Sequence, residues 1–385
     1  MKCKLSDICS FRKGKVEVEN LNAKNYISTE NMLPNKCGIT EASSLPTVSL
    51  TQEYKNGDVL VSNIRPYFKK IWQAQYDGGC SNDVLVFVPK PNTDKDFLYY
   101  VLADDDFFTY SMATSKGTKM PRGDKTSIMQ YEVPLIDLQV QKKIASVLKA
   151  LDEKIELNNE INNNLEQQAQ ALFKSWFVDF EPFDGELPSS WTNEKLGNVC
   201  NCVLGGTPSR TKPEYWKGTI PWINSGEINN FRIIKPSETI TELGLTKSAT
   251  KLLPLKTTVI AITGATLGQV SLLEIDACAN QSVVGIIPND DYPYEYIYPL
   301  IKQSVNELTS HQTGGAQQHI NKQNVESLDI LVPTAADLDK YCNTVHNLYE
   351  MIATNCFENE YLTSLRDTLL PKLMSGELDV SDIDL

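Results

Sequence analysis

The sequence predicts an α/β (α+β) fold: two mixed α/β units separated by a long antiparallel two-helix coiled coil, as a pseudo-twofold internal repeat. Three observations carry this prediction. Motifs from the first half of the 385-residue chain return in the second half. Each half contains short runs of β-branched residues bounded by Gly, Asn and Pro, which are typical of strands between turns. Each half also ends in a heptad pattern of apolar residues, which predicts a coiled-coil helix.

The first unit is expected over residues 1–133. Its runs VLVSNI and DVLVFVP predict strands, because both are rich in β-branched residues and short. The segment FLYYVLADDDFFTYSM (97–112) predicts helical structure with an aromatic face. Mixed α/β structure is therefore expected for this unit.

The second unit is expected over residues 186–332. TVIAIT and SVVGIIP predict strands there, and YEYIYPLIKQSVNEL (294–308) predicts helical structure. Its likeness to the first unit rests on three returning motifs: KLSDIC (4–9) as KLGNVC (195–200), GDVLVSN (57–63) as TTVIAIT (257–263), and CSNDVLVFVP (80–89) as ANQSVVGIIP (279–288).

A helical spacer is expected over residues 134–185, and a distal spacer helix with an acidic tail over residues 333–385. Apolar residues of the first helix recur in steps of four and three, and a shift of 197 residues gives the same pattern in the second. About 33 residues at 1.5 Å per residue would make a rod of roughly 50 Å. The second unit begins after one helix and finishes before the other, so close termini would make the helices antiparallel.

Four asparagines stand in the apolar seam of these helices: Asn158, Asn162, Asn355 and Asn359. Asn lowers helix stability, so its recurrence at matching seam positions needs an explanation. A buried polar residue in a coiled coil fixes register and partner at some cost in stability. We therefore expect these residues to set coiled-coil register, and antiparallel pairing would bring them to one level. The alternative is that Asn is merely frequent in this stretch.

Polar and basic loops of both units supply the candidate nucleic-acid contacts. Lys and Arg bind phosphate or guanine, Gln reads adenine, and glycine-rich backbone approaches a groove closely. A solvated surface is the plain alternative for any one of them. The aromatics Tyr215, Trp216 and Trp222 are expected to pack rather than stack on bases. The candidates are Arg65, Tyr67, Lys69, Lys70, Lys116, Lys119, Arg122, Lys125, Thr207, Ser209, Arg210, Lys212, Gly314, Gly315, Gln317, Gln318 and His319.

Composition bears on several classes of protein. No run approaches the roughly 18 apolar residues of a membrane span, so a cytoplasmic location is expected. Scattered cysteines and three histidines fit no ligand set, so no metal is expected. The net charge of -13 argues at first against nucleic acid. However, the acidity is concentrated in residues 134–190, with 5 basic against 10 acidic side chains, and in residues 333–385, with 3 against 10.

Several segments carry a family resemblance. GGTPSRTKPEYWKGTIPWINSGEI (205–228), ITGATLGQVSLLE (262–274), ANQSVVGIIP (279–288) and TGGAQQHINKQNVESLDILVP (313–333) closely resemble target recognition domains of the specificity (S) subunit of type I restriction-modification systems. Residues 134–182 look like the central helical spacer of that family. The first unit has KNGDVLVSN and GTKMPRG but lacks the GGTPS opening, and the distal helix departs from the pattern at Arg366.

The resemblance implies a non-catalytic DNA-binding subunit with a role in host defence in a prokaryotic cell. Each target recognition domain would read one half of a bipartite double-stranded DNA target, and the coiled coil would set the unread gap. Two modification (methyltransferase) subunits, carrying S-adenosylmethionine, would methylate adenine, and ATP-dependent restriction subunits with Mg would join them. No cofactor is expected in this chain.

Two other classes of function were weighed. A non-catalytic coiled-coil protein scaffold fits the repeated helices, and altered target methylation after Gln317 and Gln318 are replaced by Ala would argue against it. An autonomous DNA methyltransferase or nuclease is less favoured, because the chain has no [ND]PP[YF] tetrapeptide and no phosphate-binding loop. TGATLG (263–268) lacks the spacing of such a loop.

Overall fold

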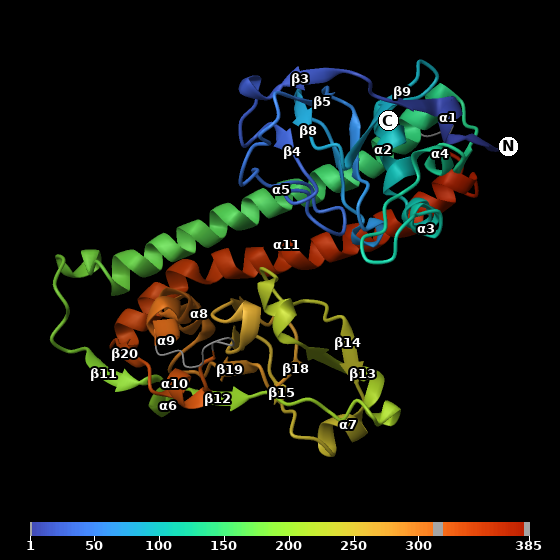
Figure 1. Cartoon of the computed structure of the whole chain (residues 1–385). Coiled ribbons are helices and arrows are strands. Elements are labelled where there is room, and N and C mark those ends of the chain that lie inside the picture. Colours follow the sequence, from blue (N-terminus) through green and yellow to red (C-terminus); the bar gives the residue numbers. More distant parts are fainter. Residues whose placement is uncertain (1, 311–318, 381–385) are drawn as a thin grey trace. The chain divides into compact units, whose positions relative to one another are not determined.

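The computed structural model describes residues 2–310 and 319–380 (Figure 1). The chain divides into two compact units: unit 1 contains Met1–Ile155 and Tyr361–Leu385, and unit 2 contains Glu156–Glu360. Each unit holds strand-rich structure and one part of each of two long helices, α5 (Leu138–Phe177) and α11 (Ala335–Ser375). The predicted α/β class is confirmed.

Among the residues that the structure describes, unit 1 contains two four-stranded sheets and one two-stranded sheet. The first has the order β2-β9-β6-β7, the second β3-β5-β8-β4, and β1 pairs with β10. The strands are β1 (Lys2–Lys4), β2 (Cys9–Phe11), β3 (Lys15–Glu17), β4 (Tyr26–Ile27), β5 (Leu50–Tyr54), β6 (Val59–Ser62), β7 (Ile71–Gln73), β8 (Gly78–Cys80), β9 (Val84–Pro89) and β10 (Glu132–Pro134). The helices are α1 (Leu5–Ile8), α2 (Lys95–Ala103), α3 (Asp105–Ala113) and α4 (Lys125–Ile128), with 3-10 turns η1 (Val18–Asn20) and η2 (Pro66–Phe68).

Unit 2 repeats this arrangement. Its first sheet has the order β12-β19-β16-β17, its second β14-β13-β18-β15, and β11 pairs with β20. The strands are β11 (Thr192–Lys195), β12 (Asn201–Leu204), β13 (Trp216–Ile223), β14 (Glu238–Ile240), β15 (Leu252–Leu253), β16 (Thr258–Ala261), β17 (Val270–Leu272), β18 (Ala277–Ala279), β19 (Val283–Ile287) and β20 (Asp329–Val332). The helices are α6 (Leu196–Val199), α7 (Glu242–Thr246), α8 (Tyr294–Gln303), α9 (Val305–Ser310) and α10 (Lys322–Glu326), with 3-10 turns η3 (Glu181–Phe183), η4 (Pro213–Tyr215), η5 (Ser225–Asn229) and η6 (Gly264–Thr266).

The strand order confirms the internal repeat. The sheet β2-β9-β6-β7 of unit 1 and the sheet β12-β19-β16-β17 of unit 2 have the same order and are antiparallel throughout. In both second sheets a central strand, β8 or β18, has one antiparallel and one parallel neighbour. The fourth strand differs, because β3 joins the antiparallel side and β14 the parallel side.

The two predicted helical segments beside the sheets are each broken once. The segment over 97–112 forms α2 and α3, because Asp104 takes an extended conformation and its side chain accepts from the amide of Asp106, which starts a new helix. The segment over 294–308 likewise forms α8 and α9, with Ser304 between them. The sequence predicted helical structure correctly but did not reveal these breaks.

The long helices α5 and α11 have 40 and 41 residues, so both exceed the predicted length. Within unit 2, Asn162 lies opposite Asn355, and within unit 1, Asp152 lies opposite Arg366. Residue numbers rise along α5 from Asp152 to Asn162 while those of their partners fall along α11 from Arg366 to Asn355, so the predicted antiparallel pairing is confirmed. Neither these helices nor any other helix among the described residues is long and apolar enough to cross a membrane.

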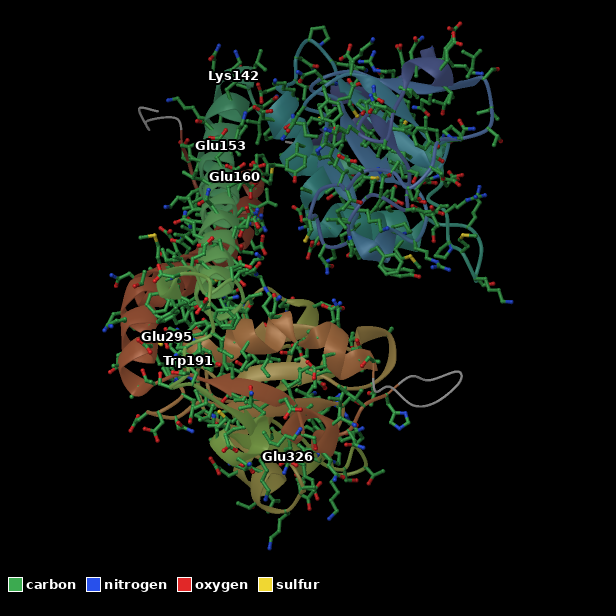
Figure 2. All side chains as sticks on the ribbon, turned by 90° about the vertical axis from the view of Figure 1, so that its left-hand side faces the viewer. Lys142, Glu153, Glu160, Trp191, Glu295 and Glu326 are labelled. Atoms are coloured by element: carbon green, nitrogen blue, oxygen red, sulfur yellow. The ribbon has the colours of Figure 1, made fainter. Side chains whose placement is uncertain are left out.

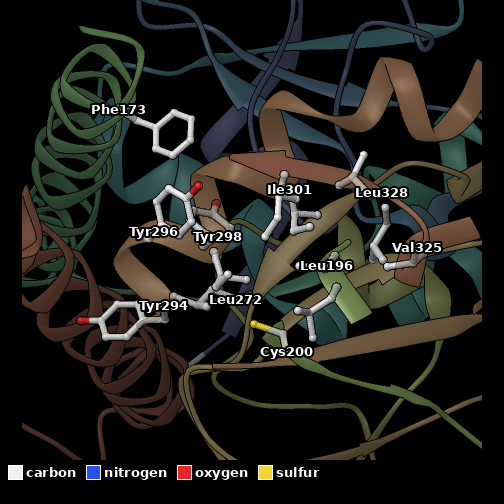
Figure 3. Close-up of a cluster of buried hydrophobic side chains, with 14 of the residues drawn as sticks. Phe173, Leu196, Cys200, Leu272, Tyr294, Tyr296, Tyr298, Ile301, Val325 and Leu328 are labelled. Carbon is white, nitrogen blue, oxygen red and sulfur yellow. The ribbon is translucent and has the colours of Figure 1, made fainter. Parts of the chain in front are cut away.

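The core of unit 2 lies between its first sheet and its parts of the long helices. Figure 3 shows side chains of this core, in which Tyr294, Tyr296 and Tyr298 of α8 lie among Leu272 of β17 and Phe173 of α5. Apolar burial of this kind stabilises by about 25 cal/mol per Å². The sheet and the helices of unit 2 therefore share one core through α8.

Polar contacts attach the same region to α11. The indole Nε1 of Trp191 donates to Asp337 Oδ2 at 3.0 Å, and Nδ1 of His346 lies 2.7 Å from Glu295 Oε1. Trp191 and Glu295 are labelled in Figure 2, where both lie near the long helices of unit 2. Their partners Asp337 and His346 belong to α11.

Candidate nucleic-acid interface

In unit 2, several loops gather at one end of the first sheet. The last residues of β12 and β16 both pair with the first residues of β19, through Leu204 with Val284 and Ala261 with Val283. The loops that leave β12 and β16 and the turn that enters β19 therefore lie together. The amide of Ile262 donates to the carbonyl of Ser282 at 2.9 Å, which joins two of these loops directly.

Unit 1 builds the same sheet end. Ser62 pairs with Val84 as Ala261 pairs with Val283, 199 positions further along. The amide of Asn63 donates to the carbonyl of Asp83 at 2.8 Å, which matches the bond from Ile262 to Ser282. The two units therefore present equivalent surfaces.

A further loop reaches this end in both units. Ile64 forms an isolated β-bridge with Arg122 in unit 1, and Thr263 forms one with His319 in unit 2. Directly afterwards, the side chain of Asp124 caps α4 and that of Asn321 caps α10. Arg122, in the predicted loop SKGTKMPRGDK, and His319, the described residue of the predicted loop TGGAQQH, thus occupy equivalent places, which sequence reasoning missed. The dipeptides Asp124-Lys125 and Asn321-Lys322, alike as helix starts, could have revealed it.

The structure brings together the two predicted basic loops of unit 1. The amide of Arg65 donates to the carbonyl of Pro121 at 2.8 Å, and the amide of Gly123 donates to the carbonyl of Asn63 at 3.2 Å. Arg65, Tyr67, Lys116, Lys119, Arg122 and Lys125 are exposed there, and Lys69 and Lys70 are partly buried.

Several of these basic side chains have partners within unit 1. Lys116 Nζ lies 2.8 Å from Asp124 Oδ1, and this hydrogen bond, with those from Ser127, lowers the pKa of Asp124 to about 2. Arg122 Nη2 lies 3.2 Å from Asp83 Oδ2, yet the side chain remains 54% exposed. Lys125 Nζ lies 5.9 Å from the centre of the Phe11 ring. Exposed ion pairs of this kind contribute little to stability, so the cations can exchange their partners for phosphate.

A polar hollow of about 410 Å³ adjoins Asp83. It is lined by hydroxyl, amide and carboxylate groups of Ser28, Glu30, Asn31, Ser81 and other residues. Such groups accept hydrogen bonds from the amino groups of bases. The hollow therefore extends the polar surface at the sheet end of unit 1.

The predicted contacts of the GGTPSRTK loop are more constrained. The guanidinium of Arg210 donates to both carboxylate oxygens of Glu238, at 2.5 and 2.8 Å, and its carbon lies 3.6 Å from the centre of the Trp216 ring. The hydrogen bond with Glu238 raises the pKa of Arg210. A cation held in this way fixes the loop, so the geometry favours a structural role for Arg210.

The neighbouring residues of this loop also have partners. Lys212 Nζ donates to the hydroxyl of Tyr215 at 3.0 Å, and the hydroxyl of Thr207 donates to Gln281 Oε1. The hydroxyls of Ser209 and Thr211 lie 2.8 Å apart.

The aromatics of the same region are packed, as predicted. Tyr215 and Trp222 are buried, and Trp216 is half-buried against Trp222 at 5.0 Å between ring centres. The indole of Trp222 donates to the carbonyl of Gly206 at 3.1 Å, which anchors the start of the loop.

The second predicted loop is described only at its last residue. Gly314, Gly315, Gln317 and Gln318 lie outside the described residues. His319 is described and exposed, at the bridge with Thr263.

The four seam asparagines meet in unit 2. Asn355 Nδ2 donates to Asn162 Oδ1 at 2.9 Å, and Asn158 Nδ2 donates to Asn359 Oδ1 at 2.9 Å. Asn158 also donates to Glu358 Oε2 at 2.7 Å. Asn158 and Asn162 are 1% and 2% exposed, so these bonds give partners to polar groups that burial removes from water, whereas Asn158 Oδ1 is buried without a hydrogen-bond partner among the described residues.

Comparison with known proteins identifies relatives of both units. The family model for the type I restriction modification DNA specificity domain matches residues 1–167 and again residues 188–355. The specificity subunit of the type I restriction enzyme HindI from Haemophilus influenzae is 27% identical over 92% of this chain and 94% of its own length. The specificity subunit of the enzyme MjaIX from Methanocaldococcus jannaschii is 27% identical over 77% of this chain and 72% of its own.

A solved structure has the same fold. The crystal structure of the type I restriction-modification S subunit from M. genitalium matches with a TM-score of 0.61 and 18% identity, covering 97% of this chain and 96% of that one.

Proposed function

The chain belongs to the type I restriction-modification DNA specificity family, and on this premise we propose that it reads a split DNA target, one half-site with each unit. It is a non-catalytic DNA sequence-recognition subunit that works in a complex with other restriction-modification subunits. The observation that carries the proposal is the repeated sheet end, where the same loops meet in both units.

The reading surfaces consist of the loops at these sheet ends. Arg122 in unit 1 and His319 in unit 2 hold equivalent exposed positions, which supports the proposal that each contacts one half-site. Arg donates to guanine O6 and N7, and the basic residues around Arg122 bind phosphate. On the domain assignment proposed here, residues 1–133 and 186–332 are the target recognition domains.

The helices set the unread gap between the half-sites. Residues 134–185 and 333–385 act as spacers in this assignment. Helix α5 has 40 residues, which correspond to about 60 Å at 1.5 Å per residue. Two readers on one face of B-DNA lie about 10 bp apart from centre to centre, so helices of this length can set such a spacing.

Partner subunits supply the chemistry in this proposal. Two modification subunits bring S-adenosylmethionine and methylate adenine, and restriction subunits use ATP and Mg to cut DNA that lacks the methylation. The net charge of -13 suits a chain whose partners contribute much of the positive surface around DNA. The complex would act in the cytoplasm of a prokaryotic cell.

Genome-wide mapping of methylated adenine tests the proposal. We expect one split motif to lose methylation when the gene is deleted and to regain it when the gene is restored. If every methylated motif survives the deletion, the chain does not direct methylation in that cell.

Two matched variants then separate the half-sites. Arg122→Ala should relax or abolish recognition of one half of the motif, and His319→Ala should do so for the other half. Asp329→Ala, on an exposed part of β20, is the control and should leave the motif unchanged. Loss of the same half in both variants would contradict the assignment of one half-site to each unit.

A further inference from the structure

The 3-10 turn η2 of unit 1 has an equivalent in unit 2, and the two differ in their side chains. η2 follows β6 and η6 follows β16, at the same place on equivalent sheets. The amide of Ser62 donates to the carbonyl of Lys70 at 3.0 Å, and the amide of Ala261 likewise donates to the carbonyl of Gln269 at 2.9 Å. The loops Arg65–Lys70 and Gly264–Gln269 are therefore matched residue by residue.

The loop of unit 1 uses side chains where that of unit 2 uses glycine. Arg65 and Lys69 have φ of 50°, and their equivalents Gly264 and Gly268 have φ of 72° and 81°. Left-handed φ is unfavourable for a residue with a Cβ atom but costs glycine nothing. Such strain persists where the surrounding structure enforces it, and it is found most often at functional sites.

Half of the described non-glycine residues with left-handed φ lie in this loop and in the segment that contacts it. Among the described residues, eight that are not glycine have left-handed φ, and four of them lie here: Asn35, Lys36, Arg65 and Lys69. The amides of Asn35 and Lys36 donate to the carbonyls of Phe68 and Lys69, at 2.8 and 2.9 Å. These hydrogen bonds therefore join the segment that contains Asn35 and Lys36 to the loop that contains Arg65 and Lys69.

Ion pairs hold the loop as well. Lys36 Nζ and Lys69 Nζ lie 2.9 and 2.7 Å from the two carboxylate oxygens of Asp105, at the start of α3. Lys70 Nζ donates to the carbonyl of Thr29 at 2.6 Å. Two lysines share one carboxylate, and the third donates to a neutral carbonyl, so the loop is held in place, and its own residues Arg65, Lys69 and Lys70 are all basic.

Two aromatic rings stand exposed on this rigid loop. Tyr67 is 49% exposed and Phe68 38% exposed, with ring centres 4.7 Å apart. Their equivalents in unit 2 are Thr266, which is small, and Leu267, which packs against the core of its unit. The hydrogen bonds and ion pairs of the loop hold these rings in an exposed position, which suits contact with a partner outside the chain. The basic residues around the rings favour an anionic partner.

We propose that the Tyr67–Phe68 pair packs against the groove of the DNA half-site bound by unit 1, and that unit 2 makes no matching contact. The proposal rests on the proposed function and adds an asymmetry to it. Aromatic and apolar side chains that press into a groove contact deoxyribose and bases and deform the duplex, so they confer specificity through DNA shape. Arg65 and the lysines would hold the flanking phosphates.

The test uses the full chain in complex with its own modification subunits and a duplex carrying the split motif. The double variant Tyr67→Ala with Phe68→Ala should weaken DNA binding by about tenfold or more. Loss of an aromatic side chain that contacts a base lowers affinity by about this factor. Hydroxyl-radical footprinting should show lost protection of sugars in one half-site only, the half affected by Arg122→Ala. Asp329→Ala, on the exposed part of β20, should change neither affinity nor footprint, and Tyr67→Phe should retain both.

The outcomes separate the two levels of inference. If the unaltered complex binds no split motif, the proposed function itself fails. If it binds and the double variant binds equally well with the same footprint, only the aromatic contact is wrong. A photo-crosslinking benzoylphenylalanine at position 67, which keeps a ring there, guards against misfolding of the double variant. Crosslinks to DNA support the proposal, and crosslinks to a modification subunit overturn it.

Discussion

Arg232 and Glu166 form a buried ion pair in unit 2. The guanidinium Nη2 donates to the carboxylate Oε2 at 2.8 Å, and the two side chains are only 1% and 6% exposed. Lys302 Nζ lies 2.8 Å from the other oxygen of Glu166, and the hydroxyl of Tyr298 donates to that oxygen at 3.2 Å. Glu166 belongs to α5, Tyr298 and Lys302 belong to α8, and Arg232 lies in the loop before β14. The network therefore joins the helix to the sheet-bearing part of its unit.

Removing Glu166 should destabilise unit 2 strongly. In Glu166→Ala, Arg232 and Lys302 would keep buried positive charge without its main counterion, and breaking a buried pair in this way costs about 3 to 5 kcal/mol. Urea denaturation followed by tryptophan fluorescence measures this, because Trp176, Trp191, Trp216 and Trp222 lie in unit 2 and only Trp72 in unit 1.

The control for this prediction is an exposed ion pair of the same unit. Asp329 pairs with Lys195 at 2.6 Å, with side chains 68% and 48% exposed. Asp329→Ala should lower the free energy of unfolding by about 1 kcal/mol or less. Equal losses in the two variants would show that the buried network contributes no more than a surface pair.

The same carboxylate makes stability depend on pH. Burial opposes its ionisation, but Arg232 and Lys302 outweigh burial and lower the pKa of Glu166 to about 2. An unfolded Glu has a pKa of about 4.3, so the stabilisation from this group is complete above that pH and is lost as pH falls toward about 2. The loss is on the order of 3 kcal/mol at most.

A comparison of wild type with Glu166→Gln isolates this effect. The difference in free energy of unfolding should be largest near pH 6 and should shrink as pH falls from 5 to 3. Glu274, whose Oε1 lies 3.5 Å from Nε of the same Arg232, acts in the opposite sense because burial raises its pKa, and it is present in both proteins. A difference that stays constant over this pH range would show that Glu166 has an ordinary pKa.

The sequence could predict features that repeat along the chain or depend on nearby residues, but it could not predict which distant residues contact one another. Returning motifs predicted the two units, and seam periodicity predicted the helices and the level at which Asn162 meets Asn355, because both signals are local or repeat at a fixed offset. Arg232 gave no signal, since a single Arg in a polar loop looks solvated until the fold buries it. The bidentate partner of Arg210 is Glu238, 28 positions away, and no pattern links the two.

The candidate interface was predicted in outline for the same reason. Basic and glycine-rich composition predicted which loops contact DNA, which stays a prediction, and the equivalence of Arg122 and His319 emerged only from sheet register. The breaks at Asp104 and Ser304 were hidden because apolar periodicity continues across them.

Replacing Asn158, Asn162, Asn355 and Asn359 together by Leu should raise the melting temperature and loosen the helix register. The amides form bonds that only one alignment satisfies, whereas Leu packs acceptably in several. Thermal denaturation measures the first effect. Spin labels at Gln167 and Thr354, both exposed in unit 2, measure the second as a broader distribution of distances. A lower melting temperature with an unchanged distribution would contradict the assignment of these residues to register.

Gly205→Ala should disrupt the sheet end of unit 2. An added Cβ would lie 2.1 Å from the carbonyl oxygen of Asn280 and 2.5 Å from that of Ala279, both in backbone that cannot move aside cheaply. Overpacking of this kind costs about 1 to 3 kcal/mol, and it would displace the loop that carries Thr207. We expect a lower melting temperature and loss of motif methylation. Gly226→Ala is the matched control, because its Cβ would approach only the side chain of Asn224, at 2.9 Å. Normal methylation and stability in Gly205→Ala would show that the close approach of this loop is not required.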